Sequence, residues 1–236
     1  VVYGDYVTVS NHFYNAENKE YDAKYNTLLM GCSFNYYYLD ELIRIAEADG
    51  IKLNICNTYF SGVPARNTWN WLIHDYTNDA TMNGENVLTF ISHVDNPEGT
   101  TISTNMSTKE CLAWKENLER PEWDFISVQD HYGINESCSY EKCMEESVPY
   151  LPNVFRYLEA TEPNATLLMH QTWSFQVGYV NGSWSMASLE QQAAEHENIK
   201  KTIYTISEMM NPPKKPANNK NRYLVFINLK LITQNL

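Results

Sequence analysis

The residues whose types and spacing favour chemistry begin with a serine at the end of an apolar run. The run Tyr25–Met30 is followed by Gly31-Cys32-Ser33-Phe34, and apolar residues at helical spacing follow over Tyr37–Ala48. This order predicts a strand, a tight turn and a helix, with the Ser33 hydroxyl at the turn and the first helical amides directed toward it. Such amides stabilise negative charge on an attacked carbonyl. We interpret Ser33 as a nucleophile, although a serine that only caps a helix gives the same local sequence.

Two further residues complete a predicted site around this serine. Gly62 lies in the loop after the predicted strand Ile51–Tyr59, where a glycine lets its backbone N–H approach a ligand closely. Gln129 ends the apolar segment Trp123–Gln129, and its side-chain amide can donate a hydrogen bond. Each residue alone reads equally well as a turn or a strand end. Together, the three donors at three strand ends predict an oxyanion hole of Ser33, Gly62 and Gln129, and therefore acyl transfer.

A nucleophilic serine needs an adjacent base, and two of the six histidines lie at predicted strand ends on the side of the site. His131 follows Asp130 directly after the strand that ends at Gln129, and His170 lies in the apolar run that begins at Thr166. His131 and His170 are therefore the candidate bases, and for His170 the alternative is a residue that shapes the pocket or binds substrate. Asp130 is not expected to orient His131, because adjacent residues of an extended chain point to opposite sides.

Strands and helices alternate along most of the chain. The periodicity predicts strands at Tyr25–Met30, Ile51–Tyr59, Trp123–Gln129 and Thr166–Gln171, and a hairpin of Val87–His93 with Thr100–Thr104. Helices are predicted at Tyr37–Ala48, at Asn67–Tyr76, from the capping box of Ser107 and Glu110 to about Glu119, at Tyr140–Ala160 with interruptions at Pro149 and Pro152, and at Ser185–Met210. This rhythm predicts an α/β fold: a mostly parallel sheet of about five strands, covered on both faces, with an inserted hairpin.

Composition excludes several classes of protein. The chain has 236 residues, of which 43% are hydrophobic, so one compact domain is expected. The net charge of -12 disfavours nucleic acids and anionic membrane surfaces as partners. No apolar run reaches the roughly 18–20 residues of a membrane span. The five cysteines include no Cys-x-x-Cys pair, so a closed metal site is not expected. No cofactor is expected either.

The cysteines and the first residue of the chain indicate the cellular compartment in which the protein is expected. Cys138 and Cys143 would close a small disulfide loop in an oxidising compartment. Four Asn-x-Ser/Thr sequons, about as many as chance gives, leave glycosylation open; they begin at Asn105, Asn135, Asn164 and Asn181. The chain begins with Val1 rather than methionine, which favours a secreted, processed protein. We divide it into a domain over residues 1–210 and a basic tail over 211–236, in which Tyr223–Ile232 could supply one more strand.

Four segments resemble motifs of the SGNH (GDSL-like) hydrolase superfamily. They are Gly31-Cys32-Ser33-Phe34, Asn57-Thr58-Tyr59-Phe60-Ser61-Gly62, Trp123–Gln129 and His170-Gln171-Thr172-Trp173. They are most similar to an uncharacterised branch, a domain of unknown function whose nucleophile motif reads Gly-Asn-Ser-Phe. The resemblance implies a three-layer α/β/α, flavodoxin-like sandwich and serine ester hydrolysis. It also implies substrate contacts from Gln171 and Trp173, with a carbohydrate-linked ester as the preferred substrate.

One departure from this resemblance concerns the base. The superfamily carries an Asp-x-x-His block after its last strand, and residues 211–236 contain neither Asp nor His. Three explanations stay open: a truncated or divergent tail, substitution by His131 or His170, or loss of catalysis. The first two favour a serine esterase, whereas the third favours an inactive SGNH-fold protein that binds a ligand or an assembly partner. A nucleotide-binding flavodoxin-like domain is disfavoured, because the turn after the first strand has a single glycine.

Overall fold

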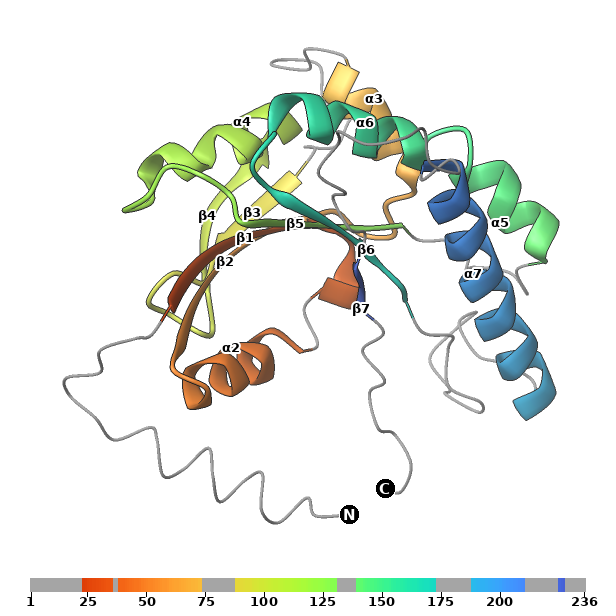
Figure 1. The fold of residues 1–236 in the computed structure, drawn as a ribbon, viewed down its shortest axis with the longest axis horizontal. Helices are drawn as coiled ribbons and strands as arrows, with labels where there is room; N and C mark the ends of the chain where they lie inside the picture. The colour runs from red at the N-terminus through yellow and green to blue at the C-terminus, as the bar shows by residue number, and fades with distance from the viewer. Residues whose placement is uncertain are drawn as a thin grey trace, which may run out of the picture.

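The fold is a seven-stranded sheet with helices on both faces (Figure 1). The computed structural model describes residues 23–35, 38–73, 88–130, 139–172, 188–210 and 225–227. The strand order is β4-β3-β2-β1-β5-β6-β7. Among these residues, no helix is both long enough and apolar enough to cross a bilayer.

Five of the strands are parallel, and they form one side of the sheet. They are β1 (Ala23–Gly31), β2 (Ile51–Tyr59), β5 (Phe125–Gln129), β6 (Thr166–His170) and β7 (Val225–Ile227). Counted along the chain, their spatial order is second, first, third, fourth, fifth, which is the flavodoxin-like order. The predicted fold class is therefore confirmed.

The predicted hairpin extends the sheet at its other side. Strands β3 (Leu88–Ser92) and β4 (Thr100–Met106) pair antiparallel, and β3 pairs antiparallel with β2. The predicted last strand is present as β7, which lies within the segment Tyr223–Ile232 and pairs with β6. The division between residues 1–210 and 211–236 stays a prediction.

The described helices divide unequally between the two faces. Helix α2 (Leu39–Ala48) lies alone on one face, and the others lie on the opposite face (Figure 1). Those others are α3 (Ala65–Ile73), α4 (Thr108–Ala113), α5 (Tyr140–Ser147), α6 (Leu151–Thr161) and α7 (Leu189–Met210), with 3₁₀ turns at Ser33–Asn35 (η1) and Trp114–Asn117 (η2). As predicted, a capping box of Ser107 and Glu110 begins α4, and the proline-containing segment divides into α5 and α6.

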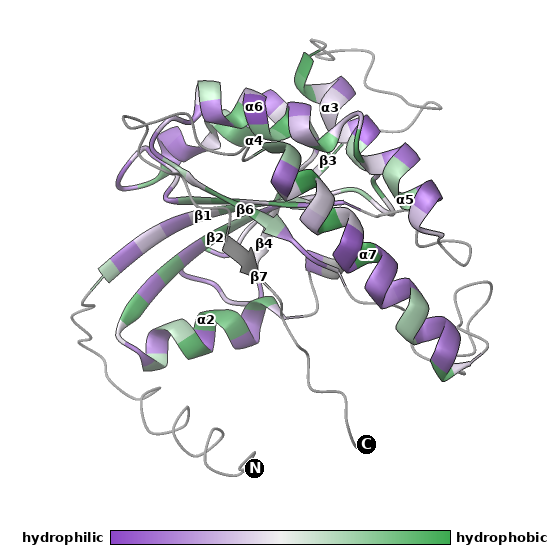
Figure 2. Cartoon of the chain, turned by 45° about the vertical axis from the view of Figure 1, so that its right-hand side comes forward, coloured by the Kyte–Doolittle hydropathy of each residue, from purple (hydrophilic) through white to green (hydrophobic). Residues whose placement is uncertain are grey.

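Two apolar cores follow from this arrangement. The larger core joins Leu28, Ile126 and Met169 of the strands to Phe155 of α6 and Ile203 of α7. The smaller core lies beneath α2 and contains Leu29, Tyr38, Leu39, Ile43 and Ile55. Figure 2 shows hydrophobic residues along the middle strands, while α2 and α7 carry both hydrophobic and hydrophilic stretches. The sheet is therefore a rigid base from which the loops at its carboxyl edge project.

Candidate functional site

The carboxyl ends of β1 and β5 form the topological switch point of the sheet. The chain leaves β1 toward α2 on one face, and the helices that follow β5 lie on the opposite face (Figure 1). Loops that diverge in this way open a crevice, and ligands of open α/β sheets bind there. Gly31 ends β1 and Gln129 ends β5, so the predicted residues lie at the expected position.

Ser33 lies on a single 3₁₀ turn rather than at the start of a helix. The turn η1 is closed by a hydrogen bond from Asn35 N to Cys32 O at 3.0 Å, and Ser33 is partly buried. Helix α2 begins later, at Leu39, with Tyr38 as its N-cap residue. The predicted helical start at Tyr37 is therefore two residues too early, and Ser33 lies six residues before the first residue of the helix. In the described part of the chain, the Ser33 hydroxyl has no hydrogen-bond partner.

Gln129 is buried directly against this turn. Its Oε1 accepts a hydrogen bond from Cys32 N at 3.0 Å, and its Nε2 donates to Asp130 O at 2.7 Å. Nε2 also lies 3.3 Å from Cys32 Sγ. A Cβ on Gly31 would lie 2.6 Å from Gln129 Oε1 and 2.8 Å from Asn35 Nδ2, so glycine is required for this close packing. The structure thus brings Gln129 to the Ser33 turn, with its amide oxygen holding the neighbouring residue.

Gly62 lies in the loop between β2 and α3 with a φ of 60°, a left-handed conformation that favours glycine. The loop is held by Asp130, whose carboxylate accepts a hydrogen bond from Ala65 N at 2.7 Å and another from the Ser147 hydroxyl. Sequence reasoning gave Asp130 no role of its own. The available signal was an acidic residue directly after an otherwise apolar strand, where a buried carboxylate requires donors.

His170 is buried, 1% exposed, and contacts the last residue of the Ser33 turn, Asn35. Its Nδ1 lies 3.1 Å from Asn35 Oδ1 and 3.5 Å from the Tyr38 hydroxyl, and the His170 and Tyr38 rings meet edge to face. Burial lowers the pKa of His170 to about 4 and raises that of Tyr38. Both groups are therefore neutral near pH 7, and they support the turn from the side of β6.

Of the remaining predicted site residues, some belong to the described part of the chain and others lie outside it. Gln171 is described and buried, 7% exposed. His131 and Trp173 lie outside the described residues, as does Cys138. Cys143 is disulfide-bonded, and its partner lies outside the described residues too. The three described free cysteines are buried: Cys32, Cys56 and Cys111. No group of three His, Cys, Asp or Glu side chains that could hold a metal ion occurs in the described ranges.

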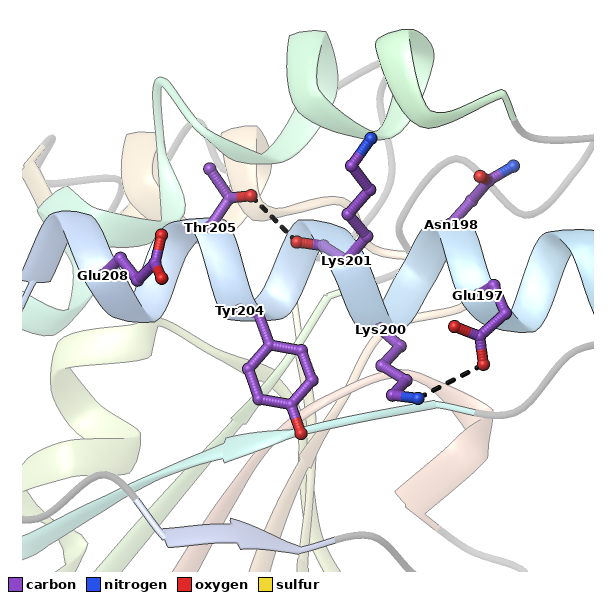
Figure 3. Close-up of a pocket in the computed structure, with 7 residues that line it drawn as sticks. All are labelled: Glu197, Asn198, Lys200, Lys201, Tyr204, Thr205 and Glu208. Carbon is purple, nitrogen blue, oxygen red and sulfur yellow. Dashed lines mark hydrogen bonds and ion pairs between the residues drawn. The ribbon is translucent and has the colours of Figure 1, made fainter.

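A shallow pocket lies along α7, and Figure 3 shows the side chains that line it. It encloses about 410 Å³ and is lined by residues of this helix alone: Glu197, Asn198, Lys200, Lys201, Tyr204, Thr205 and Glu208. The interactions drawn in it, Lys200 with Glu197 and Thr205 with the Lys201 carbonyl, stay within the helix (Figure 3). We assign it no chemistry.

Comparison with known proteins supports the fold. No family model matches the chain, and no curated protein matches it. The chain is similar to the crystal structure of a DUF4886 family protein from Bacteroides uniformis, with a TM-score of 0.56 and 21% sequence identity. The match covers 81% of this chain and 66% of that protein, so the chain spans slightly less than two thirds of its length.

Proposed function

We propose that this chain is a serine ester hydrolase of the SGNH type, with Ser33 as its nucleophile. The observation that carries the proposal is the position of Ser33 on a short turn at the switch point of the sheet. Its hydroxyl has no hydrogen-bond partner among the described residues, so it is available to a substrate. Gln129 and the Gly62 loop belong to the neighbouring strand ends, as an oxyanion hole requires.

The proposed chemistry uses these groups in one step of acyl transfer. Ser33 Oγ attacks the ester carbonyl, and the N–H groups of Ser33 and Gly62 donate to the oxyanion that forms. Gln129 Nε2 carries two N–H bonds, of which one donates to Asp130 O and the other faces the weak acceptor Cys32 Sγ. This second N–H is therefore the one that would donate to the oxyanion, in place of the weak sulfur acceptor.

The proton of Ser33 requires a base, and the two predicted histidines differ in suitability. His170 is buried, and its Nδ1 bonds Asn35 and Tyr38. Its pKa of about 4 also makes it a weak base. We therefore assign the base to His131 on its place in the sequence, directly after Asp130. A carbohydrate-linked ester remains the substrate class we favour, with Gln171 and Trp173 as its contacts.

The disulfide of Cys143 supports an extracytoplasmic location. Disulfides persist in oxidising compartments and are rare in reducing ones. Cys143 is disulfide-bonded. This agrees with the proposal that the chain is secreted and acts on an ester outside the cell.

Labelling with a fluorophosphonate tests the proposal, because this reagent reacts with activated serines. We expect wild-type protein to form an adduct that peptide mass spectrometry locates at Ser33, and to hydrolyse p-nitrophenyl acetate. Ser33→Ala should abolish both, whereas Ser103→Ala on the edge strand β4 should leave both unchanged. Ester turnover that survives Ser33→Ala would refute the assignment of the nucleophile.

A second candidate function is a non-catalytic protein that uses the same crevice to bind a ligand or an assembly partner. The observation that favours it is the burial of His170, which lowers its pKa to about 4 and makes it a weak base for Ser33. Folded wild-type protein that forms no adduct and hydrolyses no ester would support this candidate. Titration with acylated saccharides, observed by NMR, would then locate binding at the crevice.

A further inference from the structure

Asp130 is a buried residue at the carboxyl end of β5, and the proposed mechanism gives its carboxylate no part. It directly follows β5 and is 1% exposed. Burying a carboxylate is costly unless donors satisfy it. Two donors are provided by residues far away in the sequence, Ala65 N at 2.7 Å and the Ser147 hydroxyl. Because each donor binds a different oxygen, the carboxylate is held in one orientation.

The first donor connects Asp130 to the Gly62 loop. Ala65 is the first residue of α3, and the first N–H groups of a helix have no acceptor within the helix. A carboxylate at this end also interacts favourably with the helix dipole. Gly62 lies three residues before Ala65, with its φ of 60°. The position of the Gly62 N–H therefore depends on the bond between Ala65 and Asp130.

The backbone of Asp130 holds the second proposed oxyanion donor. Its carbonyl oxygen accepts from Gln129 Nε2 at 2.7 Å, while Gln129 Oε1 accepts from Cys32 N at 3.0 Å. A continuous chain of hydrogen bonds thus runs from the Ser33 turn through Gln129 to Asp130, and from Asp130 to the start of α3. The three loops of the proposed site are joined at this single residue.

We propose that Asp130 is a positioning residue that fixes the Gly62 loop and the Gln129 amide against the Ser33 turn. The consequence for catalysis rests on the proposed function; the consequence for the loop does not. Misplacing a donor or a reacting group by about 1 Å can lower a rate about 10²-fold. Loss of the carboxylate should therefore lower kcat more than it changes KM.

The test measures the loop and the reaction separately. Hydrogen exchange followed by mass spectrometry reports on residues 60–66, and p-nitrophenyl acetate hydrolysis gives kcat and KM. In Asp130→Ala we expect exchange of this segment to accelerate about tenfold or more, because a hydrogen bond to a charged acceptor is lost. We expect kcat to fall about 10²-fold with KM within about threefold of wild type. In Asp130→Asn, which keeps one acceptor oxygen, we expect the exchange rate and kcat to lie between those of wild type and those of Asp130→Ala.

Glu162→Gln is the matched control, because Glu162 is a buried carboxylate at the opposite end of the sheet, where it bonds Lys115. It should leave exchange of residues 60–66 and the kinetic constants unchanged. Unchanged exchange of this segment in folded Asp130→Ala would overturn the proposal, and so would an equal effect of Glu162→Gln. If Asp130→Ala does not fold, Asp130→Asn takes its place. Unchanged exchange of residues 60–66 in folded Asp130→Asn, or an equal effect of Glu162→Gln, would then overturn the proposal. If wild type hydrolyses no ester, the proposed function fails, and the exchange result still decides the role of Asp130.

Discussion

Replacing His170 by asparagine should remove a measurable part of the acid sensitivity of this protein. His170 is 1% exposed, and burial lowers its pKa to about 4. The imidazole of the unfolded chain has an ordinary pKa of about 6.5, so between these values the unfolded state binds a proton that the folded state does not. Stability therefore rises with pH across this window and falls as the solution is acidified through it.

The magnitude follows from the two pKa values. A fall from about 6.5 to about 4 corresponds to about 3 kcal/mol of folding free energy, present above pH 6.5 and mostly lost by pH 4. In His170→Asn the side-chain amide can still donate to Asn35 Oδ1, but it does not titrate. The pKa of His93 is also lowered by burial, and because His93 is present in both proteins its contribution cancels in their difference.

The assay is urea unfolding of wild type and His170→Asn at intervals from pH 7.5 to pH 4.5. We expect the variant to be less stable at pH 7.5 and the difference to shrink by about 2–3 kcal/mol toward pH 4.5. Leu168→Ala, on the same strand, is the control, since it lowers stability by about 2–5 kcal/mol but retains the histidine and the wild-type pH slope. Parallel stability curves for wild type and His170→Asn would refute the reasoning.

Two further variants test the packing of the Ser33 turn and the start of α4. Gly31→Ala places a Cβ 2.6 Å from Gln129 Oε1, so we expect a loss of about 1–3 kcal/mol and slower fluorophosphonate labelling of Ser33; an unchanged melting temperature and labelling rate would contradict this packing. Ser107→Ala removes the hydroxyl that accepts from Glu110 N, and we expect a loss of about 1 kcal/mol, or a melting temperature about 2–4 °C lower. Glu110→Gln keeps an acceptor for Ser107 N and should retain most of that stability, so an equal loss in both variants would argue against the hydroxyl as the main contribution.

The fold was predictable because its signals are local. The strand Ile51–Tyr59 has the predicted bounds, since Gly50 ends the preceding helix and a turn follows at Ser61-Gly62. The capping box of Ser107 and Glu110 was equally readable, because its two hydrogen bonds join residues three apart. Prediction failed where the structure depends on contacts between residues far apart in the sequence, as at the start of α2. Tyr38 continues the apolar pattern of the next helix, yet it stands outside α2, with its hydroxyl against Asn35 and His170.

The position of the candidate residues at one edge of the sheet was predictable, and the hydrogen bonds around them were not. Ser33, Gly62 and Gln129 were identified because each ends a strand or lies in the loop that follows one, and the carboxyl ends of parallel strands share one edge. The function of Asp130 depends on Ala65 and Ser147, which lie 65 residues before it and 17 residues after it. No periodicity records such a contact, so a single sequence indicates only that a buried carboxylate requires donors somewhere.

The correction at the start of α2 changes how the proposed site would stabilise charge. A helix dipole acts mainly within the first turn, and α2 begins at Leu39, beyond the 3₁₀ turn that carries Ser33. An oxyanion at Ser33 would therefore depend on separate donors, the N–H groups of Ser33 and Gly62 and the Gln129 amide. A helix holds its first amides rigidly by its own hydrogen bonds, whereas separate donors must each be held by neighbouring groups. The buried residues Gln129 and His170 bond Cys32 and Asn35 of this segment, and the Asp130 carbonyl accepts from Gln129. Separate donors would require supporting bonds of this kind.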